Sequence, residues 1–223
     1  MSSIVIERAV SPEVIAQIRA ATAAGPFVPG KETAVGGAAE IKHNLQLALD
    51  SPAAEKAALL LTAALEGNAA FQVATWVDAM MRPLFCRYEK GMSYGNHIDG
   101  AIMGEPVAIR CDIAVTVCLN DGASYEGGEL VIDVAGAPRG WKGRAGDAIV
   151  YPADTLHCVS TVTSGVREVA VFWIQSSIRD PARRRILYDL KAALDVLDRE
   201  PQPPPHVEAV RRSYFNLIRM WVG

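Results

Sequence analysis

The sequence predicts an α+β protein in which a mainly β core lies between N-terminal helices and a C-terminal helical tail. Helix-start signals and apolar residues at helical spacing dominate as far as residue 82. Short β-rich runs then alternate with clusters of Gly, Pro, Asn and Asp, a pattern typical of a sandwich or barrel. Helical spacing returns after Asp180. We therefore expect three parts: 1–82, 83–177 and 178–223.

The N-terminal part carries two strong helix-start signals. Ser11-Pro12 and Ser51-Pro52 each place a serine at the N-cap and a proline at the first helical position. The helices that they open are expected to end near Gly25-Pro26 and Gly67-Asn68. The other elements expected here are a strand at 4–6, a surface loop at 30–40 and a helix at 71–81 that Pro83 closes.

The central part is expected to consist of short strands. The β-rich runs cover 84–88, 108–119, 129–134, 147–151, 157–162 and 168–175. In the tail we expect a helix from Asp180-Pro181 to about 199, a stiff proline-rich linker at 200–205 and a last helix at about 207–221. Because both tail helices have apolar positions that need burial, we expect them to cap the core or to form a homo-oligomer.

The composition is that of an ordinary globular protein and argues against some functions. The formal net charge of −3 gives no electrostatic sign of nucleic-acid binding. No apolar run has the length of a membrane span and the N-terminus lacks signal-peptide features, so we expect a cytoplasmic protein without a membrane partner. Four cysteines without CxxC spacing favour buried free thiols over disulfides or a zinc site: Cys86, Cys111, Cys118 and Cys158.

A histidine and a carboxylate stand two residues apart at His97 and Asp99. Side chains at i and i+2 of a strand point to the same face, so this pair can present two metal ligands together. A third ligand from a distant strand, His157, would complete the 2-His-1-carboxylate triad of non-haem Fe(II) oxygenases. Three protein ligands leave positions open for oxygen and a co-substrate.

Other interpretations of these residues stay open at this point. An isolated HxD is more often a surface pair or a turn, and His157 alone could be a hydrogen-bonded core histidine. A His2Asp zinc hydrolase is the main competing metal site. The surroundings, Tyr88, Tyr94 and Arg167, suit the binding of a dicarboxylate better than hydrolysis.

Arg167 begins an apolar strand and is a candidate anchor for an acidic co-substrate. An arginine there is costly to bury without an anion, and its fork matches a carboxylate. The alternative is an exposed strand-end arginine, or an ion pair with Glu168 or Asp154.

Taken in order, these motifs resemble a known family. Residues 87–99 resemble the RYxxGxxYxxHxD pattern of prolyl 4-hydroxylase-type, Fe(II)- and 2-oxoglutarate-dependent dioxygenases. Residues 127–130 resemble the GGEL strand of these enzymes, and residues 146–152 precede His157 as expected. The segment 173–180 and the last residues, 216–221, are similar to the bacterial PKHD-type hydroxylases, the PiuC-like group.

The resemblance implies a double-stranded β-helix (jelly-roll) core and a set of site residues. His97, Asp99 and His157 would bind Fe(II), Arg167 would bind the distal carboxylate of 2-oxoglutarate, and Tyr88 would line that pocket. The reaction would use O2, convert 2-oxoglutarate to succinate and CO2, and hydroxylate a small-molecule or peptide substrate. L-ascorbate is a candidate reductant, and some members of the family are associated with iron uptake.

Two residues narrow the expected reaction within the resemblance. Related halogenases leave the carboxylate position vacant, whereas Asp99 fills it, which favours hydroxylation. Nucleic-acid dealkylating relatives carry a second arginine where this chain has Trp173. Gly100 stands where relatives often have Asn or Ser, which alters the substrate side but not the ligands.

Alternatives from other classes are a zinc or manganese jelly-roll enzyme or sensor, and a non-catalytic binding module. Two further features have structural explanations at the sequence level. Gly127-Gly128 is expected to form a tight bend or bulge, and Arg110 to pair with Asp112 or Glu105.

Overall fold

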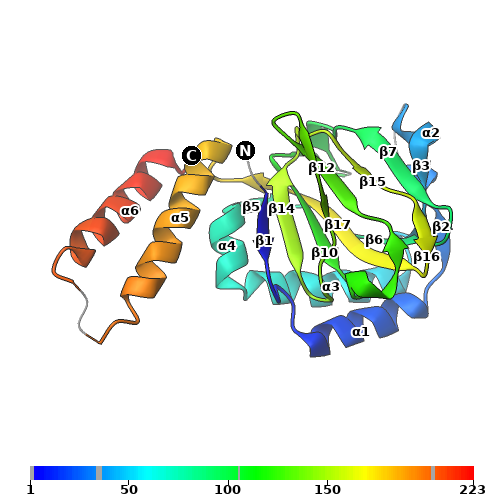
Figure 1. Ribbon diagram of the computed structural model, residues 1–223, viewed down its shortest axis with the longest axis horizontal. Helices are drawn as coiled ribbons and strands as arrows, with labels where there is room; N and C mark the ends of the chain where they lie inside the picture. The colour runs from blue at the N-terminus through cyan, green and yellow to red at the C-terminus, as the bar shows by residue number, and fades with distance from the viewer. Residues whose placement is uncertain (1–2, 34–36, 105, 202–203) are drawn as a thin grey trace.

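Two antiparallel sheets form the core of the computed structural model, which describes residues 3–33, 37–104, 106–201 and 204–223 (Figure 1). The larger sheet has the order β1 (Ile4–Ile6), β14 (Ala148–Pro152), β10 (Ile113–Cys118), β17 (Arg167–Ser176), β6 (Leu84–Tyr88), β4 (Leu45–Leu47) and β2 (Phe27–Pro29), with β5 (Val77–Met80) also paired to β17. The smaller sheet has the order β13 (Ala137–Trp141), β12 (Leu130–Val134), β15 (His157–Val159), β7 (Ser93–His97) and β3 (Lys42–His43). Two short pairs complete the strands: β8 (Ile102–Met103) with β9 (Ile109–Arg110), and β11 (Glu126–Gly127) with β16 (Val162–Ser164).

Three helices of the first 82 residues, α1 (Pro12–Ala23), α3 (Pro52–Glu66) and α4 (Ala69–Thr75), cover the outer face of the larger sheet, whereas α2 (Ala38–Ile41) lies beside the smaller sheet (Figure 1). Ser11 and Ser51 cap helices as expected, since each side-chain oxygen accepts a hydrogen bond from the backbone three residues on. Apolar residues such as Ile18 and Leu61 are fully buried against the sheet. The 3₁₀ turn η1 (Gly30–Thr33) precedes α2.

The expected helix at 71–81 is wrong in its second half. Helix α4 ends at Thr75, and Trp76 adopts the left-handed conformation with φ +50°, its N–H bonded to the Gln72 carbonyl. The next four residues form β5, which pairs with the buried strand β17. Backbone pairing to a strand distant in sequence therefore overrides the local helical pattern.

Strands also replace part of the expected N-terminal helical scaffold. β1 to β5 all come from the first 82 residues and complete both sheets. The expected loop at 30–40 contains η1 and most of α2, and its residues 34–36 lie outside the described part. No single helix in the described ranges is long and apolar enough to cross a membrane; α3 and α4 together pass by length and composition, but they are bent by 88°.

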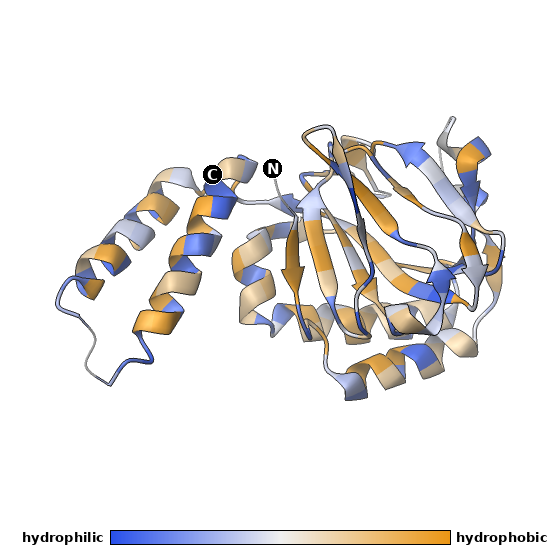
Figure 2. Ribbon diagram, viewed as in Figure 1, coloured by the Kyte–Doolittle hydropathy of each residue, from blue (hydrophilic) through white to orange (hydrophobic). Residues whose placement is uncertain are grey.

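The two tail helices, α5 (Pro181–Leu197) and α6 (Val207–Trp221), match the expected ranges closely. They pack against each other as a hairpin that extends away from the sheets (Figure 1). Apolar positions recur along both helices in Figure 2, and the residues buried between them and the neighbouring loop are Ile178, Leu187, Leu194, Val207 and Tyr214. Of the expected linker at 200–205, residues 202–203 lie outside the described part.

A second hydrophobic cluster lies between the two sheets. The larger sheet contributes residues such as Ala114 and Ile149, and the smaller sheet contributes Leu130, Ile132 and Val159. The candidate site residues lie among these inner-face side chains. The turn η2 (Gly122–Ser124) follows β10.

Candidate metal centre

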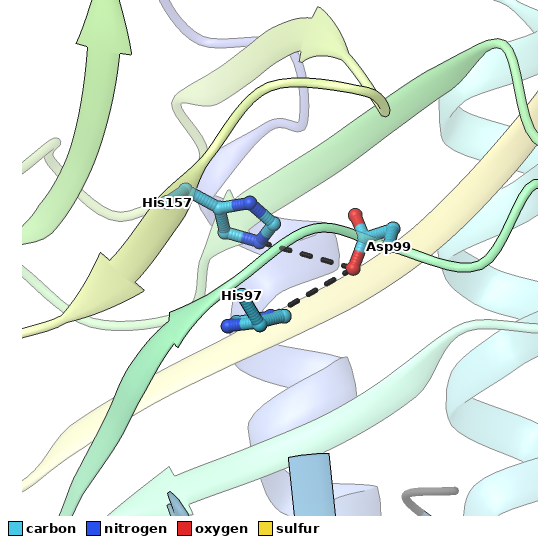
Figure 3. A group of neighbouring side chains, drawn as sticks. All are labelled: His97, Asp99 and His157. Atoms are coloured by element: carbon cyan, nitrogen blue, oxygen red, sulfur yellow. Dashed lines mark ion pairs between the residues drawn. The ribbon is translucent and has the colours of Figure 1, made fainter. Parts of the chain in front are cut away.

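The neighbouring strands β7 and β15 bring the two histidines together. His97 ends β7, His157 begins β15, and the two residues are register partners across the antiparallel pair. Their ring centroids lie 4.2 Å apart. Asp99 follows β7 by two residues and points back toward both rings (Figure 3).

The three side chains present one ligand atom each toward a common point. The Asp99 Oδ1 lies 3.8 Å from the Nε2 of His97 and 3.8 Å from the Nε2 of His157. Ligand atoms of the three residues all lie within 4.8 Å of one another. The side chains of His97, Asp99 and His157 are 9%, 7% and 6% exposed, so the group is shielded from water yet not sealed.

Backbone contacts fix the orientation of both imidazoles. The Nδ1 of His97 lies 2.8 Å from the Gly95 carbonyl, and the Nδ1 of His157 lies 2.9 Å from the Thr155 carbonyl. A carbonyl oxygen only accepts, so each Nδ1 carries the proton and each Nε2 keeps its lone pair for the centre. This is the usual arrangement of metal-binding histidines.

Burial shifts the pKa values of the three side chains so that the neutral form of each is favoured. It lowers the pKa of His157 and, together with the charge of His157, that of His97. It raises the pKa of Asp99, and the facing Trp173 indole offsets part of that rise. The Asp99 Oδ2 is buried without a hydrogen-bond partner among the described residues. A divalent cation would compensate this buried carboxylate, so the donor set fits Fe(II).

Each histidine of the group contacts one tyrosine ring. The Tyr94 ring stacks on the His97 ring at 3.7 Å between centroids, with an interplanar angle of 19°. The Tyr151 ring meets His157 edge-on at 5.2 Å. Tyr94 thus packs against a candidate ligand.

Arg167 is buried, with 3% of its surface exposed. It stands opposite Tyr88 across β17 and β6, and its Cζ lies 4.9 Å from the centre of the Tyr88 ring. Glu168 bonds Arg19 and Arg87 instead, and Asp154 is exposed. The Arg167 Nη1 is buried with no hydrogen-bond partner in the part of the chain that the structure describes. The exposed strand-end interpretation is therefore wrong, and an unpaired donor remains for an anion.

The expected bulge at Gly127-Gly128 is confirmed and makes room for Arg167. The register of β11 and β16 shifts at Gly127, and the two glycines have φ +66° and +61°. A Cβ on Gly128 would lie 3.2 Å from the Arg167 Cδ. The pair of glycines therefore shapes the backbone beside the candidate anchor.

Two other sequence predictions have structural outcomes. Arg110 binds Asp112 through two hydrogen bonds of 2.7 and 2.8 Å, as expected; Glu105 lies outside the described residues. All four cysteines are free, and only Cys158 is half-buried rather than buried.

The sequence reasoning missed three polar residues of the interior: Lys42, Asn44 and Gln46. They alternate along one extended segment and are all buried. The period-2 alternation was visible in the sequence, but polar residues in that pattern suggest an exposed face. The remaining histidines, His43 and His206, are exposed, and neither belongs to the candidate metal group.

Comparisons with known proteins agree with this geometry. A family model described as the 2OG-Fe(II) oxygenase superfamily matches residues 83–175. A PKHD-type hydroxylase of Delftia acidovorans is 40% identical over 214 residues, which cover 95% of either chain.

The fold is similar to those of solved prolyl hydroxylase structures. A prolyl-4-hydroxylase of Pseudomonas putida superposes with a TM-score of 0.53 and 17% identity, covering 78% of this chain and 92% of that chain. A Trichoplax adhaerens prolyl hydroxylase, in complex with a hypoxia inducible factor peptide fragment, gives a TM-score of 0.59 with 13% identity and covers 83% and 86%. These matches confirm the expected jelly-roll core.

Proposed function

The chain belongs to the PKHD-type hydroxylases of the 2OG-Fe(II) oxygenase superfamily and is an Fe(II)- and 2-oxoglutarate-dependent dioxygenase, and on this premise we propose that His97, Asp99 and His157 bind the iron. The observation that carries the assignment is the convergence of their ligand atoms within 4.8 Å. Bound iron would supply the redox chemistry that couples O2 and 2-oxoglutarate, with release of succinate and CO2, to hydroxylation of the substrate.

The protein's own contribution at the centre is to orient the ligands and keep them in the binding-competent form. The Gly95 and Thr155 carbonyls hold the protonated Nδ1 atoms, so the Nε2 lone pairs of both histidines face Asp99. Burial favours neutral imidazoles, which a metal requires. Three protein ligands would leave a bound metal open to O2 and the co-substrate.

We propose that Arg167 binds the distal carboxylate of 2-oxoglutarate and that Tyr88 forms the wall beneath it. The buried guanidinium with an unpaired Nη1 supports this role, because a carboxylate would satisfy both its charge and its donor. Tyr88 is 3% exposed, and its ring lies under the guanidinium. Since Asp99 fills the carboxylate position, the proposed outcome at the substrate is hydroxylation rather than halogenation.

The test measures the formation of succinate from 2-oxoglutarate. The protein is first loaded with Fe(II) under anaerobic conditions, and O2 is then added to start the reaction. The wild type should form succinate, His157→Ala should not, and His43→Ala should behave as the wild type because His43 is exposed and outside the metal group. Full succinate formation by His157→Ala would show that the ligand assignment is incorrect.

Other features of the enzyme stay proposals. The primary substrate is a small molecule or a peptide, ascorbate is a candidate reductant, and the location is cytoplasmic. The division into 1–82, 83–177 and 178–223 also stays a proposal, with strands β1 to β5 of the first part completing the sheets of the core. We propose that the α5–α6 hairpin, which extends from the core, mediates a homo-oligomer; light scattering of the full chain and of a variant lacking 178–223 would test this.

A further inference from the structure

A buried polar strip connects the metal centre to the Arg167 side of the interior. Its residues are Lys42, Asn44 and Gln46, with 8%, 5% and 1% of their surfaces exposed. Lys42 pairs with Tyr94 in the smaller sheet, and Gln46 pairs with Cys86 in the larger sheet. The segment therefore passes from one sheet to the other, and Asn44 lies at the crossing.

The two end residues of the strip, Lys42 and Gln46, are hydrogen-bonded to each other. The Lys42 Nζ donates a hydrogen bond of 2.9 Å to the Gln46 Oε1 and lies 5.5 Å from the centre of the Tyr94 ring. The Tyr94 ring in turn stacks on the His97 ring. Lys42 and Gln46 are thus linked to the metal side of the interior through Tyr94.

Asn44 lies close to the candidate co-substrate anchor. Extension of the β4–β6 register places Asn44 opposite Tyr88, which stands opposite Arg167. Burial raises the pKa values of Tyr88 and Cys86, and both the Arg167 charge and the Asn44 amide oppose these rises. Asn44 and Arg167 therefore surround the same two side chains.

Within the described ranges, neither the Nδ2 nor the Oδ1 of the Asn44 amide makes a hydrogen bond of acceptable distance and angle, although the amide lies near Tyr88 and Cys86. A buried amide left in that state destabilises a fold unless a ligand or water satisfies it. The backbone closes one side of the amide, because a Cβ on Gly30 would lie only 1.8 Å from Oδ1. The Arg167 Nη1, beyond Tyr88, is a second buried donor in the same condition.

We propose that Asn44 is a co-substrate-binding residue whose Nδ2 donates a hydrogen bond to the distal carboxylate of 2-oxoglutarate beside Arg167. A carboxylate offers two oxygens, so the amide and the guanidinium can each be satisfied by one ligand. The inference rests on the proposed role of Arg167. It assigns a binding contact to a segment far from the HxD motif.

The experiment compares Asn44→Leu with the wild type as full-length protein loaded with Mn²⁺. Calorimetry measures the affinity for 2-oxoglutarate and for pyruvate, which has the 2-oxo acid group but no distal carboxylate. We expect Asn44→Leu to weaken 2-oxoglutarate binding about 10- to 100-fold, the range for one hydrogen bond to a charged group, and to leave pyruvate binding unchanged. The Tm of the metal-free variant should equal or exceed that of the wild type, because leucine removes an unpaired amide of similar volume.

Two further variants keep the test decisive. Asn44→Asp retains the shape but places a carboxylate against the ligand's carboxylate, so it should weaken 2-oxoglutarate binding more than Asn44→Leu. Asn68→Leu is the matched structural control, since the Asn68 side chain already bonds the Ala9 carbonyl and the Phe71 N–H at the start of α4. It should lower the Tm and leave both affinities unchanged.

The outcomes separate this inference from the function on which it rests. If Arg167→Met loses 2-oxoglutarate affinity while Asn44→Leu keeps it, the Asn44 assignment is wrong and the Arg167 anchor stands. Equal weakening of 2-oxoglutarate and pyruvate by Asn44→Leu would also overturn the assignment, because the effect would then not depend on the distal carboxylate. If Arg167→Met binds 2-oxoglutarate normally, the proposed anchor itself is incorrect.

Discussion

Replacing Asp99 by alanine should separate metal binding from folding. The carboxylate is 7% exposed, burial raises its pKa, and its Oδ2 lacks a partner among the described residues. Without metal, the substitution therefore removes a poorly compensated buried group, and we expect the Tm to stay equal or rise. With metal, it removes the only carboxylate that faces His97 and His157 in the candidate group.

The size of the effect follows from ligand linkage. At a free Mn²⁺ concentration of 100 times the Kd, a single site stabilises the wild type by about 2.7 kcal/mol. For a chain of this length that corresponds to a Tm rise of about 5–11 °C. Loss of a residue that only supports a ligand costs about 10- to 100-fold in affinity, so loss of a ligand should cost at least about 100-fold. The stabilisation at the same Mn²⁺ concentration then falls to about 0.4 kcal/mol, or about 1–2 °C.

The assay is thermal unfolding with and without Mn²⁺, followed by near-UV circular dichroism. Asp154→Ala is the matched control, because this exposed carboxylate lies three residues before His157 and outside the metal group. It should keep the wild-type Mn²⁺ shift. If Asp99→Ala also kept the full shift, the carboxylate would not be a ligand and the assignment of the triad would be refuted.

Burial lowers the pKa values of His97 and His157, so the Mn²⁺ affinity measured by calorimetry should persist down to pH 6.5 and be lost only below it. In the metal-free protein, the unfolded histidines bind more protons than the folded ones below pH 6.5, so the stability should fall as the pH falls. Loss of Mn²⁺ affinity already above pH 6.5 would contradict this. Gly128→Ala should lower stability by about 1 kcal/mol or more and weaken 2-oxoglutarate binding, because it adds a Cβ beside Arg167 at positive φ, whereas Gly136→Ala, also at positive φ but with nothing within 4 Å, should lower stability only. Leu187→Ala should cost about 2–5 kcal/mol in urea unfolding, since Leu187 is 0% exposed between the tail helices, and a cost near zero would mean that the hairpin is not packed as described.

The convergence of the candidate metal-binding residues was predictable because much of the information is local. His97 and Asp99 are close in sequence, and a β core brings a later histidine to them by strand pairing. The proposed role of Arg167 depends on burial, which the sequence only suggested through the apolar strand after it. The structure supplied the missing fact, a guanidinium that is 3% exposed with an unpaired Nη1.

The errors arose where long-range contacts override local pattern. Residues 77–80 have no strong strand signal of their own, yet they pair with β17 and become β5. The strip Lys42–Gln46 has the alternation of an exposed strand, but its polar face turns inward because the segment crosses between two sheets. We infer that the buried polar residues at this crossing face a ligand. The periodicity of a single sequence does not distinguish such residues from polar residues that face water.

The charges of the interior imply that metal and co-substrate reinforce each other's binding. Asp99 is a buried carboxylate of the interior, and Arg167 and Lys42 are buried cationic side chains there. A divalent metal alone adds to the uncompensated positive charge in this low-dielectric space, and the dianion of 2-oxoglutarate offsets it. Each ligand should therefore raise the affinity of the site for the other by the same factor. Because Asn44 contributes a donor but no charge, Asn44→Leu should weaken 2-oxoglutarate binding without abolishing this coupling, whereas Arg167→Met should change both.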